Sequence, residues 1–440
     1  AIALVYAILS GFWGVVVTDL VQFCIAIFGS IALAIIALNH VGGMEKLLFK
    51  LSQLMGSDAI HENTLKFVPP VPEAALNTST FWESPFSKFL IFITVMWWSH
   101  HGTDGGGYII QRMSSAKNER HALLATLWFN LAHYALRVWP WILVAVVSIV
   151  MFPMIPESYS DLGVKAGYPL VMNTLLGPGL KGILIVSFLA AFMSTIDTHL
   201  NWGASYLIND IYKRFFKPSE SERHYVLVGK IITVILMILA AFTALKMQSI
   251  SKAWEFIFSM GAGIGLVLIL RWFWWRINAW SEITALATSI LITISLEFIA
   301  WSQTVSAGNQ YSLFGTAPVL FGITLQVHHK LMIIVPLAII AWVSATFLTS
   351  PEPIGHLKVF YERVQPGGWW APVTKGFEHT AQPVSKGILI QWFAGILMIY
   401  GFTFGIGNLI FTNYSNAVLL FGCAFIGSYL IWNRSISKLN

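Results

Sequence analysis

Residues 189–215 carry closely spaced polar side chains in an otherwise apolar run, LAAFMSTIDTHLNWGASYLINDIYKRF. Ser194, Asp197 and Thr198 are three and four residues apart, which places them on one face of a helix, with Thr195 beside them. Hydroxyl and carboxylate oxygens are ligands that suit a hard cation rather than a soft metal. The alternative is that the hydroxyls only bond back to carbonyls of their own helix, which leaves Asp197 unexplained.

A second anomaly lies at residues 97–108, WWSHHGTDGGGY, where Asp104 and four glycines interrupt another apolar run: Gly102, Gly105, Gly106 and Gly107. A glycine costs about 1 kcal/mol per helical position relative to alanine. We therefore predict that 97–108 is a non-helical interruption whose free backbone groups line a cavity. The alternative is that a short apolar segment ends here and the glycines belong to a loop.

Weaker candidates for contact with a small solute lie in two other apolar runs. His133 and Arg137 are four residues apart and share a helix face, from which either could reach a carboxylate or hydroxyl. A structural ion pair, for instance with Asp104, is the alternative. Trp254 and Glu255 open a further run, where they either contact solute or mark a membrane interface.

Several other patterns favour structure over chemistry. The glycines of 261–265 follow no strand, so they predict close helix packing rather than a nucleotide-binding loop. The paired histidines at 100–101 and 328–329 lack further ligands at a metal-binding spacing and are expected at the membrane interface. Glu297 is expected near the outer end of its helix, in a structural role.

Composition decides which class of protein holds these residues. Only 10% of the 440 residues are charged, 56% are hydrophobic and the mean hydropathy is +0.70. A soluble protein carries about 25% charged residues, so the chain predicts an all-α polytopic membrane protein and excludes a soluble enzyme, a nucleic-acid binder and a disordered chain. No nucleophile–base pair or metal centre indicates an enzyme, and the two cysteines lie in apolar runs and predict no disulfide.

Ten apolar stretches are long enough to cross a bilayer. The stretch 1–9 is too short, and we interpret it as the remnant of a preceding helix. The ten expected spans are 12–39, 86–111, 121–152, 179–208, 225–247, 253–275, 279–302, 331–349, 386–409 and 413–433.

The larger share of Lys and Arg falls in loops on the same side as the C-terminus, which predicts a cytoplasmic C-terminus in a cell (plasma or inner) membrane. We expect one transmembrane domain over 1–433, with a long outer connection at 40–85, a long inner one at 351–385 and a short cytoplasmic tail at 434–440.

Four stretches resemble the sodium:solute symporter family, which includes sodium/glucose, sodium/proline and sodium/sialic acid cotransporters. They are 11–22 (GFWGVVVTDLVQ), 108–118 (YIIQRMSSAKN), 189–215 and 270–282 (LRWFWWRINAWSE). The resemblance implies a leucine-transporter-like fold of two inverted five-helix repeats, here an N-terminally truncated fragment that lacks the first core helices. In that scheme 12–39 is the fifth core helix, 86–111 the broken sixth and 179–208 the eighth.

The resemblance also implies Na⁺ as the coupling ion and two sets of sodium ligands. The first maps onto Ala191, Ser194 and Thr195, and the second onto Asp19, Ser194, Asp197 and Thr198. Sugar carriers of the family hold their substrate with amide and lysine side chains, whose positions fall near Gly106, Trp254 and His133 in this chain. This chain therefore lacks that sugar-binding set, and the identity of its solute is not predicted.

These patterns predict a secondary active transporter that couples Na⁺ to symport of a small polar solute (a sugar, an amino acid or an organic acid). Its partners would be the solute, Na⁺ and the lipid bilayer, with no nucleic acid. The alternatives are a proton-coupled symporter and a transporter-like sensory membrane module. The solute candidates are Asp104, Gly105, Gly106, Gly107, His133, Arg137, Trp254 and Glu255.

Overall fold

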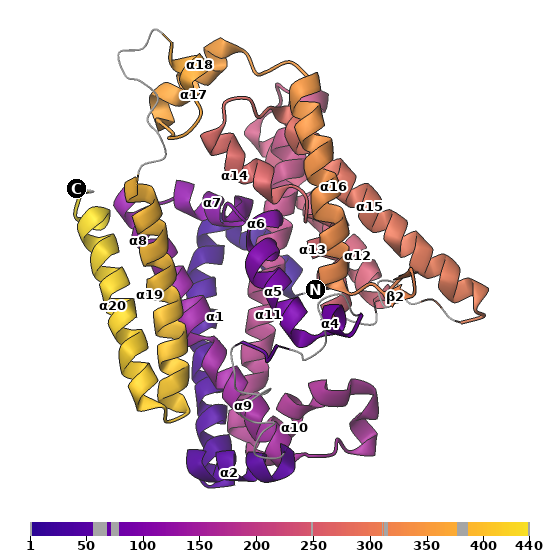
Figure 1. Ribbon diagram of the computed structural model, residues 1–440, viewed down its shortest axis with the longest axis vertical. Helices are drawn as coiled ribbons and strands as arrows, with labels where there is room; N and C mark the ends of the chain where they lie inside the picture. The colour runs from indigo at the N-terminus through magenta and orange to yellow at the C-terminus, as the bar shows by residue number, and fades with distance from the viewer. Residues whose placement is uncertain are drawn as a thin grey trace. The chain divides into compact units, whose positions relative to one another are not determined.

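The computed structural model describes residues 2–55, 68–71, 79–247, 250–309, 311, 316–375 and 386–438 (Figure 1). Within these residues every long element is a helix, and the strands are confined to one two-stranded hairpin. The chain divides into two compact units that alternate along the sequence. Unit 1 comprises 1–64, 119–245 and 394–440, and unit 2 comprises 65–118 and 246–393.

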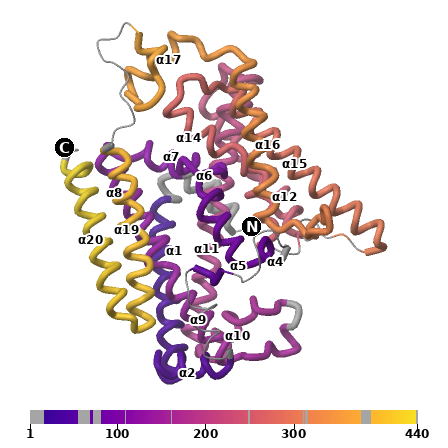
Figure 2. Tube along the Cα trace, viewed as in Figure 1, coloured from indigo at the N-terminus to yellow at the C-terminus, as the bar shows by residue number. Residues whose placement is uncertain are grey.

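Unit 1 is built mainly from long helices, which Figure 2 follows along the Cα trace. Its elements include two π-helical turns (η3 and η5) and two 3₁₀ turns (η4 and η6), and α12 and α19 each extend beyond its boundary. They are α1 (Ile2–Val41), α2 (Met44–Met55), α8 (Glu119–Asn130), η3 (Leu131–Leu136), α9 (Val138–Met151), η4 (Glu157–Ala166), α10 (Gly167–Leu175), α11 (Pro178–Tyr206), η5 (Leu207–Phe216), α12 (Glu222–Lys246), α19 (Lys386–Ile410), α20 (Tyr414–Arg434) and η6 (Ile436–Lys438).

Helices α1 and α11 form the central pair of unit 1. Two hydrogen bonds define how they lie: Ser187 Oγ donates to the Ile25 carbonyl at 3.1 Å, and Ser194 Oγ donates to Asp19 Oδ1 at 2.5 Å. Residue numbers rise along α11 as they fall along α1, so the helices are antiparallel. Gly29 allows the close approach, because a Cβ there would lie 2.9 Å from Ser187 Oγ.

Other helices of unit 1 support this pair. Helix α9 packs against α1 and α2, and Trp139 at its start donates its indole N–H to the Thr403 carbonyl of α19 at 2.9 Å. Helices α19 and α20 pack together and against α8, with Ala394, Met398 and Ile431 buried between them. The amphipathic stretch that follows α1 forms α2 and buries Leu47 and Leu51 completely.

Unit 2 contains shorter elements and two interrupted helices. Its elements are α4 (Ser79–Glu83), α5 (Pro85–Ile91), the π-helical turn η2 (Phe92–Met96), α6 (Trp97–Ser99), α7 (Gly106–Ser114), α13 (Ile250–Met260), α14 (Gly265–Phe273), α15 (Ala279–Ser306), β1 (Val319–Leu320), β2 (Ile323–Thr324), α16 (Val327–Leu348), α17 (Ile354–Val364) and α18 (Ala371–Thr374). Helices α15 and α16 pack along each other (Figure 1).

The two interruptions of unit 2 pack against each other. Helices α13 and α14 meet at a bend of 41°. A Cβ at Gly265, just after the bend, would lie 2.2 Å from the Trp98 carbonyl oxygen, and one at Gly263 would lie 2.2 Å from Ser289 Oγ. The expectation of close packing at 261–265 is therefore confirmed, and the expected span at 253–275 is bent at this point.

The connection at 351–385 packs locally against the end of α14. Trp370 is buried, and its indole N–H donates to the Trp272 carbonyl at 3.1 Å. Its neighbour Trp369 donates its backbone N–H to the Phe273 carbonyl at 2.6 Å. Residues 376–385 of this connection lie outside the described part of the chain, as do 56–67 and 72–78 of the outer one.

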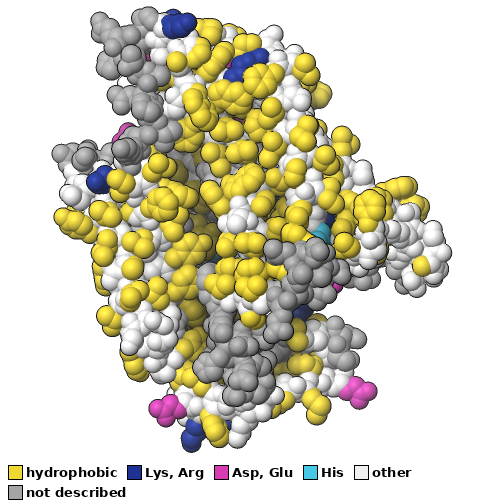
Figure 3. Space-filling view, in the orientation of Figure 1, with side chains coloured by type: hydrophobic (Ala, Val, Ile, Leu, Met, Phe, Trp, Pro, Cys, Tyr) yellow, Lys and Arg dark blue, Asp and Glu magenta, His cyan; other side chains and the backbone are white. Residues whose placement is uncertain are grey.

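The predicted all-α polytopic class is confirmed. Eight described helices are long and apolar enough to cross a membrane, or nine if the bent pair α13–α14 counts as one span. These correspond to nine of the ten expected spans, and the tenth, 86–111, is interrupted. Hydrophobic side chains dominate the face in view (Figure 3).

The interpretation of residues 1–9 as a remnant distinct from the first span was wrong from Ile2 onward, because α1 runs unbroken from Ile2 to Val41. At 1.5 Å per residue, a helix of 40 residues is about 60 Å long and exceeds the hydrocarbon thickness.

Candidate functional site

The α1–α11 contact brings together the polar residues that the sequence singled out on two distant segments. Asp19 and Ser194 are 175 residues apart in the chain, and the Ser194 hydroxyl donates to the Asp19 carboxylate. Ser194 is half-buried, and Thr198, one turn further along α11, is 5% exposed. We call this contact the seam: Asp19 and Gly29 on α1, and Ser187, Ala190, Ser194 and Asp197 on α11.

Asp197 is the least conventional residue of the seam. Its side chain is 0% exposed, and neither carboxylate oxygen has a hydrogen-bond partner within the described residues. The Asp19 carboxylate lies close enough to repel it electrostatically. Because an ionised carboxylate buried without a partner is very unfavourable, the position needs a cation or a proton.

The other expected sodium ligands lie on the next face of α11. The Thr195 hydroxyl donates to the Ala191 carbonyl at 3.0 Å, and both residues are exposed. This is the back-bonding alternative considered from the sequence, and it holds for Thr195 but not for Ser194. A hydroxyl that donates its proton still has lone pairs for a cation, so the contact does not remove Thr195 from the ligand set.

The interrupted segment of unit 2 differs in extent from the expectation. Residues 97–99 and 106–108 are helical, so the non-helical part is 100–105, preceded by the π-helical turn η2. Gly105 and Gly106 adopt φ values of +93° and +65°, a left-handed conformation that residues with a Cβ rarely adopt. The glycines therefore turn the chain at the break and start α7.

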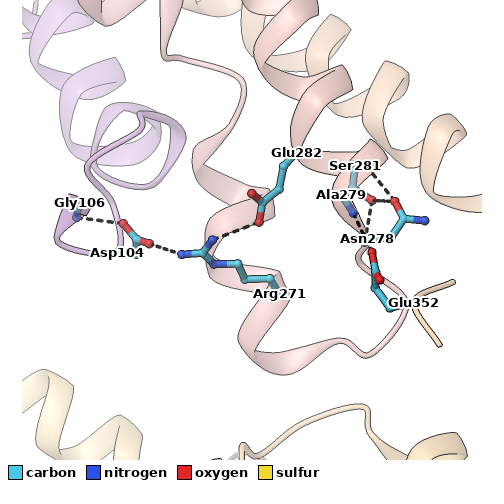
Figure 4. Close-up of polar contacts among 8 residues, drawn as sticks. All are labelled: Asp104, Gly106, Arg271, Asn278, Ala279, Ser281, Glu282 and Glu352. Carbon is cyan, nitrogen blue, oxygen red and sulfur yellow. Dashed lines mark hydrogen bonds and ion pairs between the residues drawn. The ribbon is translucent and has the colours of Figure 1, made fainter. Parts of the chain in front are cut away.

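Asp104 is part of a charged network within unit 2 (Figure 4). Its Oδ1 accepts the Gly106 backbone N–H at 3.0 Å, and its Oδ2 lies 2.8 Å from Arg271 Nη2. The Nη1 atom of Arg271 lies 3.1 Å from Glu282 Oε1. Asp104 was considered as an ion-pair partner of His133 or Arg137, but it pairs with Arg271 instead.

Arg271 and Glu282 were not among the predicted site residues, although both lie within the quoted stretch 270–282. In the same stretch, Asn278 caps α15 by accepting the Ser281 N–H at 3.0 Å, and its amide nitrogen donates to Thr349 and Ser350. Glu352 accepts the Ala279 N–H at 3.4 Å (Figure 4). This stretch therefore joins three helices of unit 2.

The remaining solute candidates have ordinary surroundings. His133 lies in the π-helical turn η3, stacked on Phe129 at 5.2 Å between ring centroids, and Arg137 is exposed. Trp254 is also exposed, and Glu255 forms an ion pair with Lys252 at 2.9 Å. Within unit 1, the described ring contacts of His133 are with Phe129 and Tyr134 and not with a seam residue.

The histidine pair 328–329 is buried in the first turn of α16. His328 is 2% exposed, and its Nε2 lies 2.7 Å from the Trp82 carbonyl oxygen. The adjacent Lys330 pairs with Glu297 at 3.1 Å, which agrees with the structural role predicted for Glu297.

We expect the Asp104–Arg271 pair to behave as one structural unit. Arg271→Ala leaves the Asp104 carboxylate, 10% exposed, without its cation, and should lower stability by about 1–3 kcal/mol. Asp104→Asn should cost less, because the amide oxygen can still accept the Gly106 N–H. Thermal unfolding of the purified protein in detergent measures both.

The double variant Asp104→Asn/Arg271→Ala is the control for coupling. It should be no less stable than Arg271→Ala alone, because a neutral amide does not need a guanidinium partner. If the stability loss of the double variant equals the sum of the two single losses, Asp104 and Arg271 are not coupled.

Comparisons with known proteins were made for the whole chain. The model of the sodium:solute symporter family matches residues 1–291. The sodium/mannose cotransporter of Bos taurus is 27% identical over 325 residues, covering 68% of this chain and 53% of that protein. The sodium/glucose cotransporter of Vibrio parahaemolyticus is 25% identical over 339 residues, 72% of this chain and 59% of that protein.

A bacterial transporter and a solved structure are also similar to this chain. The osmoregulated proline transporter OpuE of Bacillus subtilis is 24% identical over 310 residues, 67% of this chain and 56% of that protein. A structure of a Na⁺-coupled sialic acid symporter, substrate-bound and outward-open, aligns with a TM-score of 0.49 and 16% identity, over 79% of this chain and 65% of that one.

The chain thus spans a little over half the length of these three relatives, 53–59%. The family match covers Asp19, Asp104, Ser194 and Asp197, along with the quoted stretch 270–282. The chain belongs to the sodium:solute symporter family.

Proposed function

We propose that the protein is a secondary active transporter that couples Na⁺ to symport of a small polar solute across the cell membrane. The observation that carries this is the seam: two carboxylates, Asp19 and Asp197, meet beside the Ser194 hydroxyl in a membrane-spanning helix pair. Helix α1 contains no Lys or Arg, and α11 contains only Lys181. A mobile cation balances the charge of Asp197, whose buried oxygens have no hydrogen-bond partner within the described residues.

Two overlapping sodium positions share Ser194. The first uses the Ala191 carbonyl and the hydroxyls of Ser194 and Thr195. The second uses Asp19, Ser194, Asp197 and Thr198, all oxygen ligands that suit Na⁺. Membership of the family supports both positions, and the buried unpartnered oxygens of Asp197 support the second.

The solute binds beside the interrupted helix of unit 2. The backbone groups freed at 100–105 supply hydrogen bonds, and Gly105, Gly106 and Gly107 let a ligand approach the backbone. Asp104 and Glu255 are engaged in ion pairs. Trp254, the remaining candidate in this unit, contributes an aromatic contact. The relatives include sodium/mannose, sodium/glucose and proline transporters, and this supports a small polar solute.

Na⁺ entry drives uptake. An ion that crosses a potential of about 100 mV releases about 2.3 kcal/mol from the field alone. Na⁺ binding at the seam favours the outward-open state, and the solute then binds before both are released inside. The excess of basic residues in the loops on the C-terminal side supports a cytoplasmic C-terminus in the plasma or inner membrane.

A proton is the competing coupling ion, because the two carboxylates of the seam can share one. Uptake of labelled sugars, amino acids and organic acids into proteoliposomes that contain the full-length protein tests the proposal. We expect accumulation of one solute under an inward Na⁺ gradient and none when choline replaces Na⁺. Accumulation driven equally by a proton gradient in choline would assign the coupling to protons.

A further inference from the structure

The short hairpin between α15 and α16 carries an unusual residue at its tip (Figure 1). Strands β1 and β2 pair so that Phe321 and Gly322 form a two-residue turn. Both residues have a positive φ, +53° for Phe321 and +78° for Gly322. Turns of this kind favour Asn, Asp or Gly, because a positive φ brings the Cβ of a bulky residue into conflict with the backbone. Phe321 is therefore strained.

The contacts of the hairpin hold this strained tip in place. The Phe321 side chain is fully exposed, so packing within the chain does not offset the strain. The base of the hairpin is fixed, since the Leu325 N–H donates to the Pro318 carbonyl at 2.8 Å. The side-chain amide of Gln303 on α15 makes two hydrogen bonds to the backbone of Val319, at 2.7 and 2.9 Å. Strain that the surroundings impose is typical of functional positions.

Two contacts give the register between the antiparallel helices α15 and α16. Ser281 Oγ lies 2.7 Å from Thr346 Oγ1. Glu297 pairs with Lys330 at 3.1 Å, in the same register. The first residue of α16 therefore lies opposite Ala300 of α15.

This register gives the depth of the hairpin in the membrane. Helix α16 has 22 residues and is about 33 Å long, close to the hydrocarbon thickness of about 30 Å, so its first residue lies near the hydrocarbon boundary. Gln303 follows Ala300 by three residues and is hence about 4.5 Å beyond that boundary. The hairpin that Gln303 holds therefore lies in the headgroup layer, where exposed aromatic residues such as Trp301 are enriched.

We propose that Phe321 inserts into the bilayer where headgroups meet acyl chains, and that it anchors the α15–α16 connection to the membrane surface. Apolar side chains of interfacial segments bury at this depth. Contact with lipid then offsets the strain at the tip, which packing within the chain does not. The inference goes beyond the proposed function, and the orientation proposed above assigns the anchor to the outer leaflet.

The test measures which solvent surrounds the tip in phosphatidylcholine vesicles. The full-length protein, with Cys24, Cys423 and any other native cysteine replaced by alanine, carries a nitroxide label at Phe321→Cys. Its collision rates are measured with O₂, which concentrates in the bilayer, and with a water-soluble nickel complex. We expect the O₂-to-nickel ratio to be close to that at Phe298→Cys, on an exposed face of α15, and about threefold higher than at Ser219→Cys, in the loop before α12.

A second measurement removes the aromatic ring and keeps the turn. Phe321→Asn places at the tip a residue that tolerates a positive φ. The label is moved to Val319→Cys on β1, where the native side chain is 40% exposed. We expect Phe321→Asn to lower the ratio at Val319→Cys about twofold, because the hairpin loses its apolar contact with the bilayer. Thr412→Asn, at another exposed residue with a positive φ, is the matched control and should leave the ratio unchanged.

A label at Phe321→Cys with the nickel accessibility of Ser219→Cys overturns the proposal. Dipolar broadening that disappears on dilution with unlabelled protein also overturns it, because the tip then lies against a second copy of the chain. Should Phe321→Cys fail to fold, an unchanged ratio at Val319→Cys in the Phe321→Asn variant overturns it instead. These measurements use neither solute nor an ion gradient, so a failure of the proposed Na⁺ coupling is distinguishable from a failure of the anchor.

Discussion

Replacing Asp197 with asparagine should raise the Na⁺ concentration for half-maximal stabilisation at least tenfold, equivalent to about 1.4 kcal/mol of binding free energy. The substitution removes a negatively charged ligand that is 0% exposed. In choline, the same variant should be as stable as the wild type or more so, because one of two repelling carboxylates is gone. The readouts are thermal unfolding with NaCl titration and Na⁺-dependent uptake.

Asp19→Asn should also raise the half-maximal Na⁺ concentration. The double variant should lose less Na⁺ binding free energy than the sum of the two single losses, because either change empties a shared position. Acid inhibition of uptake should also weaken in both single variants, since a proton competes with Na⁺ for the carboxylate pair. Asp210→Asn, an exposed carboxylate further along the same helical segment, is the control. Strict additivity would show that Asp197 is only a structural partner.

Ser194→Ala should have the second largest effect. Its hydroxyl oxygen serves both proposed sodium positions and also holds Asp19 in place through the hydrogen bond across the seam. We expect a rise of about three- to tenfold in the half-maximal Na⁺ concentration for uptake. Ser194→Thr keeps the hydroxyl and should recover part of the loss.

Thr195→Ala should raise the same concentration less than Ser194→Ala, because Thr195 is a ligand of one position only and is exposed. Ser205→Ala removes a hydroxyl of α11 that bonds to its own helix, at the Trp202 carbonyl, and should have no effect on Na⁺ dependence. Wild-type Na⁺ dependence in both Ser194→Ala and Thr195→Ala would refute the ligand assignment.

The helical segments of this protein could be predicted well because the signal is local. A run of about 20 apolar residues must form its backbone hydrogen bonds internally when it lies in lipid, so length and composition are enough to identify a span. The predicted spans at 279–302 and 413–433, for example, agree with α15 and α20 to within a few residues. The polar face of α11 likewise follows from helical spacing alone.

Breaks in helices were harder to predict. The four glycines of 102–107 marked one break, but its predicted limits were wrong because Gly106 and Gly107 begin α7. The glycines at 261–265 indicated close helix packing, but the 41° bend at the same place was not predicted. A glycine serves equally in a turn and in a tight helix contact, and only the neighbouring backbone, here Trp98 and Ser99, distinguishes the two.

The sequence by itself determined the membrane class, most spans and the candidate oxygen ligands, since each depends on residues within a few turns of one another. Only the tertiary structure decided which of them meet: Asp19 with Ser194 across 175 residues, and Asp104 with Arg271 across 167. It also showed that Asp197 is buried and that its carboxylate oxygens have no hydrogen-bond partner within the described residues. Contacts between distant segments depend on how helices pack, which the periodicity of a single helix does not specify.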